Sequence, residues 1–230
     1  MPHRQRPYTI LSVAQSIDGF IAGTSGFNRF SSDQDLDDLH KLRSTVGAIA
    51  VGIGTVLADN PRLTVRRGFE GAKPLRVVFD SFLRLPKDAL VLNGEAHTVV
   101  FCGEDASPSS FDALGPLCEV VAVGKGKVDI KRALEFLASE KRVDRLLVEG
   151  GGKIIGSFLR EDLADELRVS INPFICGEGV KMVSVSEKSD WGDKKGTSLL
   201  DIRFYPKSVQ QFGHSVVITY LHARYFERSN

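Results

Sequence analysis

Short runs of apolar, β-branched residues alternate with helix-like segments along most of this 230-residue chain. Such runs are typical of strands that are buried on both faces, and their alternation with helices favours a mostly parallel sheet covered by helices. The sequence therefore predicts an α/β fold. The expected strands are Tyr8–Val13, Ala48–Ile53, Leu75–Phe79, Thr98–Phe101, Val120–Val123, Leu146–Val148 and Glu166–Ile175.

Three segments between these strands have helical spacing. The first opens with Ser32-Asp33-Gln34-Asp35, which predicts a capped start with acidic residues in the first turn, and it places leucines 36, 39 and 42 on one face. The others are Asp129–Glu140 and Gly152–Arg160.

The last part of the chain has a different pattern. Ser186–Ser198 is polar and is expected to be an exposed loop. Ser208–Gln211 and His214–His222 predict an antiparallel hairpin at a sheet edge, joined through Phe212-Gly213. We expect one domain over residues 1–230, with its core at about 8–222.

Composition excludes several classes of function. The net charge is +1, which predicts neither a nucleic-acid partner nor an anionic membrane surface. No apolar run approaches the roughly 18 residues of a membrane span. The three cysteines (102, 118 and 176) form no CxxC pair and the five histidines have no metal spacing, so we expect buried thiols, no metal and a cytoplasmic location.

The segment VGIGTVLADNPRLTVR, residues 51–66, begins like a dinucleotide-binding loop. A Rossmann fingerprint needs a third glycine where Leu57 stands, and Pro61 arrives too soon for a long helix. About one helical turn can form, which places Thr55 and Asp59 on one face. The arginines that follow, 62, 66 and 67, suit a phosphate, although a plain connection with solvated arginines is the alternative.

A second candidate is LLVEGGGKIIGSF, residues 146–158, in which a strand runs through three glycines into a helix. The free amide groups of a helix N-terminus favour an anion. Glu149 lies at the carboxyl end of the strand, where ligands bind in open α/β sheets, and it could act as an acid, a base or a hydrogen-bond acceptor. The alternative is a charge partner for the helix N-terminus.

Two further glycine-rich stretches follow strand-like runs. In SIDGFIAGTSGF, residues 16–27, Asp18-Gly19 indicates a turn, and the stretch suits either a flap over a ligand or an ordinary loop. Gly177-Glu178-Gly179 is a second turn, with Lys181 close in sequence. From the residues alone, several glycine-bearing strand ends indicate a dinucleotide or phosphate ligand.

In combination these motifs resemble the riboflavin-biosynthesis reductase family, whose fold is dihydrofolate reductase-like. The motifs SIDG, LRS, GIGTVLADNPRLTVR, PLRVVFDS, LLVEGGG and INPFICGEG occur in the family's order over roughly residues 8–222. The resemblance is greatest to the stand-alone form of archaea and fungi. The zinc deaminase signature of the fused bacterial form is lacking, so we expect no deamination.

The resemblance implies a homodimeric enzyme that uses NADPH, with NADH as the alternative, to reduce the ribosyl group of a phosphorylated pyrimidine to ribityl. For such a reaction, Glu149 or Asp59 could assist the opening of the ribose ring by proton transfer. The implied cofactor contacts are Thr55, Asp59, Ser81, Gly151, Gly152, Lys153, Ile154, Ile155, Gly177, Glu178, Gly179 and Val180. The implied substrate contacts are Asn28, Arg43, Leu63, Arg66 and Glu149.

Other functions remain compatible with the same motifs. The substrate could be the deaminated form of the pyrimidine nucleotide, or the chain could be another dihydrofolate reductase-like oxidoreductase. A regulatory protein that binds a nucleotide without catalysis is a third alternative, which the combination of Thr55, Asp59 and Glu149 disfavours.

Overall fold

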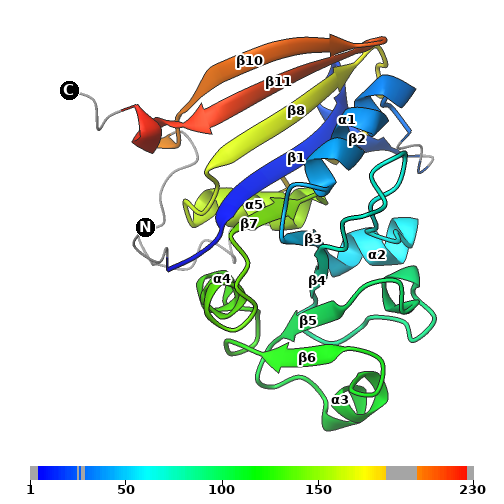
Figure 1. Cartoon of the computed structure of the whole chain (residues 1–230), viewed down its shortest axis with the longest axis vertical. Helices are drawn as coiled ribbons and strands as arrows, with labels where there is room; N and C mark the ends of the chain where they lie inside the picture. Colours follow the sequence, from blue (N-terminus) through cyan, green and yellow to red (C-terminus); the bar gives the residue numbers. More distant parts are fainter. Residues whose placement is uncertain (1–4, 25, 27–28, 185–200, 227–230) are drawn as a thin grey trace. The chain divides into compact units, whose positions relative to one another are not determined.

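The computed structural model describes residues 5–24, 26, 29–184 and 201–226 (Figure 1). The chain divides into two compact units, and each is described by itself. The first unit comprises Met1–Tyr8 and His40–Leu147, and the second comprises Thr9–Leu39 and Val148–Asn230. The expected single domain over residues 1–230 stays a prediction.

The secondary structure of the described residues alternates between strands and helices over most of the chain. The strands are β1 (Tyr8–Ser16), β2 (Phe20–Gly23), β3 (Ala48–Gly52), β4 (Leu75–Phe79), β5 (Thr98–Cys102), β6 (Glu119–Ala122), β7 (Arg145–Val148), β8 (Glu166–Asn172), β9 (Gly179–Lys181), β10 (Phe204–Phe212) and β11 (Ser215–His222). The helices are α1 (Asp33–Arg43), α2 (Ile53–Asp59), α3 (Pro108–Leu114), α4 (Ile130–Ser139) and α5 (Gly152–Arg160), with short 3₁₀ turns η1 (Leu90–Leu92) and η4 (Ala223–Tyr225).

The first unit contains a sheet with the strand order β7-β3-β4-β5-β6. The pairs β3–β4, β4–β5 and β5–β6 are parallel, with Val51 opposite Val78 in the first of them. Every residue of β5 is buried, as expected for a strand covered on both faces. Helix α4 buries Ile130, Ala133, Leu134 and Leu137, and Asp129 caps it by accepting a hydrogen bond from the backbone N–H of Arg132.

The second unit contains the strand order β10-β11-β8-β1. Strands β1 and β8 are parallel, whereas β11 is antiparallel to β8 and to β10. A separate two-stranded ladder joins β2 to β9. The α/β class, the mostly parallel sheet and the antiparallel C-terminal hairpin are therefore confirmed (Figure 1).

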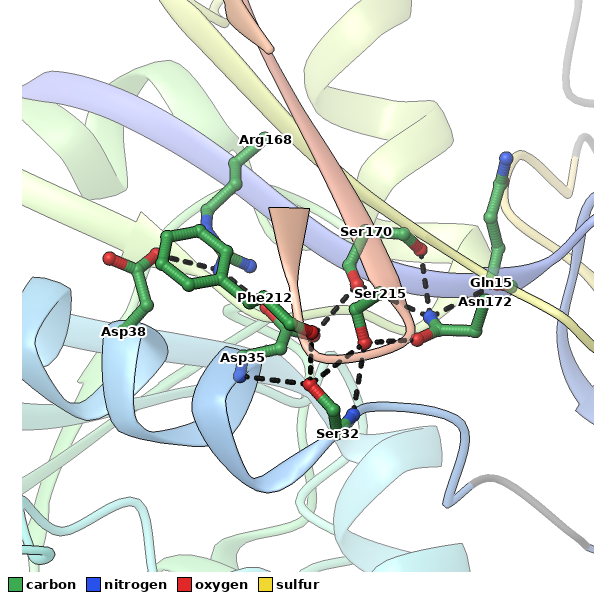
Figure 2. Close-up of polar contacts among 9 residues, drawn as sticks. All are labelled: Gln15, Ser32, Asp35, Asp38, Arg168, Ser170, Asn172, Phe212 and Ser215. Carbon is green, nitrogen blue, oxygen red and sulfur yellow. Dashed lines mark hydrogen bonds and ion pairs between the residues drawn. The ribbon is translucent and has the colours of Figure 1, made fainter. Parts of the chain in front are cut away.

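Helix α1 is fixed to β8 of the second unit by buried charges (Figure 2). Arg168 Nη2 donates to Asp35 Oδ1 at 2.6 Å and to Asp38 Oδ2 at 2.8 Å, and the Asp35 and Arg168 side chains are only 2% and 6% exposed. The Ser170 hydroxyl donates to the other oxygen of Asp35 at 2.7 Å. A carboxylate can be buried at this depth because its oxygens are satisfied by a guanidinium and a hydroxyl.

The start of α1 is held by the turn of the C-terminal hairpin. Ser32 Oγ accepts the N–H of Asp35 at 3.2 Å, which confirms the predicted cap, and donates to the carbonyl of Phe212. Ser215 Oγ accepts the N–H of Ser32 and donates to Asn172 Oδ1 at 2.6 Å, so the network continues to the end of β8 (Figure 2).

Several expected boundaries were wrong. The strand expected to reach Ile175 ends at Asn172, where the chain turns into the segment before Gly177. The hairpin strands begin at Phe204 and Ser215, and His214 belongs to the turn. The expected loop Ser186–Ser198 lies outside the described residues.

The cysteines also differ in part from expectation. All three are free, but only Cys102 is buried, whereas Cys118 and Cys176 are half-buried. Burial raises the pKa of the Cys102 thiol to about 11, with a smaller contribution from Asp80, and burial raises the pKa of Cys118 to about 11 as well.

Candidate functional site

Helix α2 carries the two polar residues expected to share a face, Thr55 and Asp59. The helix has seven residues, so it is longer than the single turn expected. It ends at Asn60, which lies in the left-handed region (φ 41°) and donates its N–H to the carbonyl of Val56 at 2.9 Å. The side-chain oxygen of Asn60 accepts the N–H of Leu90 at 2.8 Å, so the helix end is also tied to η1.

The segment after α2 has an unusual backbone at Leu63. This residue has φ 50°, a conformation that costs a bulky residue about 1–3 kcal/mol and that is typical of functional sites. Its side chain is only 2% exposed and belongs to the core. A substrate contact by Leu63 would therefore come from its backbone.

A basic cluster forms in the first unit around His40. The buried ring of His40 accepts the backbone N–H of Arg66 on Nδ1 at 2.9 Å. On its other side His40 Nε2 lies 3.3 Å from Nη1 of the buried Arg43, which donates to the carbonyl of Thr64 at 3.0 Å. Arg43 and Arg66, which were predicted as separate substrate contacts, are thus both held by His40, a residue that no sequence motif indicates.

The electrostatics of this cluster suit an anion. The side chain of Arg66 reaches solvent, and partial burial followed by the positive charges of Arg43 and Arg62 lowers the pKa of Arg66. Arg62 itself is paired with Glu95 at 2.7 Å. A phosphate at Arg66 would relieve the repulsion between the guanidinium groups.

Ser81 lies at the carboxyl edge of the parallel strands β4, β5 and β6. Its hydroxyl accepts the N–H of Val128 at 3.1 Å, and its carbonyl accepts the N–H of Gly103 at 3.0 Å. The preceding Asp80 is fully buried, and burial raises the pKa of its carboxyl group although Leu85 donates an N–H to it. Ser81 therefore joins three loops at the edge where α/β sheets bind ligands.

In the second unit, Glu149 follows β7 directly and is half-buried. The glycines after it lead into α5, whose N-cap is Gly151, and the peptide bond between Gly150 and Gly151 is cis. Because a glycine cap has no side-chain acceptor, the first amide groups of α5 suit an external anion. Ile154 and Ile155 are buried, so a cofactor contact at these positions would use backbone atoms.

The turn Gly177–Val180 belongs to the same unit and is exposed. The strand that follows it lies against the start of α5, since a side chain at Gly152 would come within 2.4 Å of the Lys181 carbonyl. The structure thus brings together the two glycine-bearing segments expected to contact the cofactor. The expected substrate contact Asn28 lies outside the described residues. Among the helices that are described, none is long and apolar enough to span a membrane.

Comparison with known proteins gives one family. The family described as the RibD C-terminal domain matches residues 7–218. A *Methanothermobacter thermautotrophicus* protein named 2,5-diamino-6-ribosylamino-4(3H)-pyrimidinone 5′-phosphate reductase is 45% identical over 174 residues, which are 75% of this chain and 80% of that protein. An *Archaeoglobus fulgidus* protein of the same name is 42% identical over 75% of this chain and 83% of that protein.

Solved structures agree on the fold. A *Thermotoga maritima* protein described as a deaminase and reductase has a TM-score of 0.75 at 28% identity, with 95% of this chain matched to 57% of that one. The chain therefore spans little more than half of this two-activity neighbour. A *Saccharomyces cerevisiae* riboflavin biosynthesis reductase has a TM-score of 0.72 at 22% identity and covers 97% of this chain and 93% of its own.

Proposed function

The chain belongs to the RibD C-terminal domain family, and on that premise we propose that it reduces 2,5-diamino-6-ribosylamino-4(3H)-pyrimidinone 5′-phosphate to the ribityl form in riboflavin biosynthesis. The similarity to two archaeal reductases of that name, across at least 80% of each, carries the proposal. The alternatives are the deaminated nucleotide and another substrate on the same fold.

The basic cluster supports a phosphorylated substrate. We assign the 5′-phosphate to Arg66, with Arg43 as a second positive group. The two guanidinium groups repel each other, and a bound anion would compensate this repulsion. Asn28, the backbone of Leu63, and Glu149 are the further substrate contacts in this proposal.

The reductase relatives imply a nicotinamide cofactor. The start of α5 fits its phosphate groups, because its glycine N-cap leaves the first backbone amide groups without a side-chain cap. The exposed turn Gly177–Val180 is the second proposed contact, although the N–H of Gly177 is itself bonded to Asp18. Thr55, Asp59 and Ser81 are the proposed contacts in the first unit. We propose NADPH as the cofactor, with NADH as the alternative.

The cofactor supplies a hydride, and the residues position the carbon that receives it. When the ribose ring opens, the bond between C1′ and the ring oxygen breaks, the nitrogen on C1′ loses its proton as the C=N bond of an imine forms, and the ring oxygen takes a proton. Addition of hydride to C1′ forms a C–H bond and moves the C=N electron pair to nitrogen, which takes a second proton. Glu149 or Asp59 is proposed to assist the ring opening by proton transfer.

An assay of NADPH oxidation tests the function directly. The diamino and the deaminated nucleotides are offered side by side, and we expect faster turnover of the diamino compound. Preference for the deaminated compound would assign the alternative substrate. Absence of oxidation of NADPH and of NADH with both nucleotides, together with no rise in melting temperature at saturating concentrations of either cofactor, would contradict any reductase function.

A matched pair of variants tests the phosphate assignment. Arg66→Ala is expected to raise the KM for the substrate more than the Kd for NADPH. The control Arg132→Ala, which loses an exposed pair with Glu104 outside the basic cluster, should change the substrate KM far less. The reverse pattern for Arg66→Ala would move this residue to the 2′-phosphate of the cofactor.

We also propose a homodimer and a cytoplasmic location. The edge strand β10, which carries exposed apolar side chains, supports the homodimer. Three free cysteines are typical of a reducing compartment.

A further inference from the structure

Asp18, at the turn between β1 and β2, accepts hydrogen bonds from a segment 158 residues further along the chain. The N–H of Cys176 lies 3.1 Å from both carboxylate oxygens, and the N–H of Gly177 donates to Oδ2 at 2.7 Å. The Ser16 hydroxyl donates to Oδ1 at 2.6 Å and thereby fixes the carboxylate. These bonds are charge-assisted, which makes them stronger than bonds between neutral groups.

Backbone pairing on both sides of Asp18 continues this contact. Before it, the N–H of Ile17 donates to the carbonyl of Phe174 at 2.9 Å. After it, β2 pairs with β9, and a side chain at Gly179 would come within 2.0 Å of the Ala22 carbonyl. The segment from Ile17 to Gly23 therefore forms a support along the whole turn that contains Gly177 and Gly179.

The supported turn is rich in glycine, and this makes a support necessary. Gly177 has φ 70° and Gly179 has φ 149°, conformations that favour glycine. Because glycine has no side chain, nothing in these residues themselves restricts the backbone to these angles. A free glycine-rich turn would lose conformational entropy when it binds a ligand. Hydrogen bonds to a fixed carboxylate order the turn before the ligand binds, so less conformational entropy is lost on binding.

We propose that Asp18 is a positioning residue for cofactor binding, because it fixes the turn Gly177–Val180 in the conformation that receives the nicotinamide cofactor. The inference rests on the proposed function, since it takes this turn as a cofactor contact. The low pKa of Asp18, about 2, agrees with it: the Ser16 hydroxyl and then the Gly177 N–H stabilise the carboxylate.

The residues that follow β9 contact the second segment proposed to bind the cofactor, which is the first turn of α5. The N–H of Ser184 donates to the carbonyl of Gly152 at 3.1 Å, and a side chain at Gly156 would meet the Ser184 carbonyl at 3.0 Å. Asp18 therefore supports the turn on one side, while the first turn of α5 packs against the residues that follow it.

The test compares Asp18→Ala, Asp18→Asn and the control Asp112→Ala, which changes an exposed aspartate of α3. The Kd for NADPH is measured by calorimetry, and the KM values for NADPH and for the pyrimidine nucleotide are measured separately. Asp18→Ala is expected to raise the Kd and KM for NADPH about tenfold or more, with the nucleotide KM within about twofold of wild type. Asp18→Asn keeps an acceptor oxygen and should lie between the two.

Amide hydrogen exchange without cofactor gives an independent measurement. The N–H groups of Cys176 and Gly177 should exchange faster in Asp18→Ala than in wild type and the control. If Asp18→Ala does not fold, Asp18→Asn supports the same comparison.

The outcomes separate the two proposals. Wild-type binding of NADPH with an unchanged Kd in Asp18→Ala would overturn the positioning role and leave the proposed function intact. Failure of the wild type to bind NADPH would overturn the cofactor assignment, and the role of Asp18 in cofactor binding with it. Equal losses in KM for both substrates would show a general structural role and would also overturn the inference.

Discussion

His40 shows how one buried side chain can organise a charged cluster. Its Nδ1 accepts the N–H of Arg66, and its ring is 4% exposed, so this bond is shielded from water. The same ring contacts Arg43, three residues later in α1. Since Arg66 is the proposed phosphate contact, His40 controls where its backbone lies.

We expect His40→Ala to raise the substrate KM by about tenfold, because the loss of a buried acceptor costs roughly 1–2 kcal/mol and frees the Arg66 backbone. His40→Asn places an acceptor near the position of Nδ1 and should recover part of the loss. Steady-state kinetics at saturating NADPH measure both. A substrate KM unchanged in His40→Ala would contradict the role.

The carboxyl group of Asp18 predicts a pH dependence of stability. Its folded-state pKa is lowered from 3.8 to about 2, first by the Ser16 hydroxyl and then by the Gly177 N–H. A lowered pKa contributes stability that is present above the unfolded value and is lost as pH falls through the folded value. The wild type should therefore lose stability relative to Asp18→Asn between pH 4 and about 2.

Chemical denaturation at a series of pH values measures this difference. The difference in free energy of unfolding between wild type and Asp18→Asn should be constant above about pH 5 and shrink on acidification. A difference that stays constant down to pH 2 would mean that the carboxylate makes no stabilising bonds.

Asn60 ends helix α2 by adopting the left-handed backbone conformation. Alanine at this position has the cost of the left-handed conformation, about 1–2 kcal/mol, and loses the bond to the Leu90 N–H as well. Glycine loses only the bond. We therefore expect Asn60→Ala to lower the free energy of unfolding, measured by urea denaturation, by about 2 kcal/mol and Asn60→Gly by about half as much. Equal losses in the two variants would contradict a contribution from the left-handed backbone at this position.

Helix α1 depends on Arg168 for its position on β8. Arg168→Met removes the partner of the buried Asp35 carboxylate, and an uncompensated buried charge costs about 3–5 kcal/mol. The control is Arg132→Met, because Arg132 pairs with Glu104 while both side chains are exposed, and such pairs contribute at most about 1 kcal/mol. Urea denaturation measures both, and similar losses would show that the Arg168 pair is not desolvated.

The elements also show what the sequence could predict. Helix α5 was predicted with its observed bounds, because the signals that define it are local: glycines precede the helix, and its apolar residues follow helical spacing. Strands β2 and β9 were missed, since they have four and three residues and no buried face. The leucines of α1 were predicted to share one face, yet the buried residues of this helix are polar. The partner of Asp35 lies 133 residues away and could not be predicted from local spacing.

The same reason limits prediction of the candidate site. Thr55, Asp59 and the glycines before α5 stand in local patterns, and the helices that carry them were recognised. Asp18 was read only as a turn residue because its partners, Cys176 and Gly177, are distant in sequence. His40 carries no motif of its own, and its role follows only from a hydrogen bond to a backbone atom.

The exposed edge of strand β10 indicates self-association of the chain. It stands at the end of the strand order of the second unit, and its Tyr205 and Val209 side chains are 42% and 64% exposed. A long edge strand with exposed apolar residues is a template for pairing with another strand. Because Pro206 and Lys207 interrupt the first half of β10, we expect pairing over residues 208–212. A second copy of this chain that paired with β10 would satisfy the backbone groups of this edge and would cover the exposed side chain of Val209.

We expect light scattering after size exclusion to give twice the mass of one chain for the wild type, and Val209→Lys to give a single chain because a buried lysine opposes pairing. Leu117→Lys, at an apolar residue 44% exposed in the first unit, is the matched control and should remain dimeric. Dissociation by Leu117→Lys with a dimeric Val209→Lys would place the interface elsewhere. Since no proposed ligand contact lies on β10, a folded Val209→Lys monomer should still bind NADPH, which separates assembly from cofactor binding.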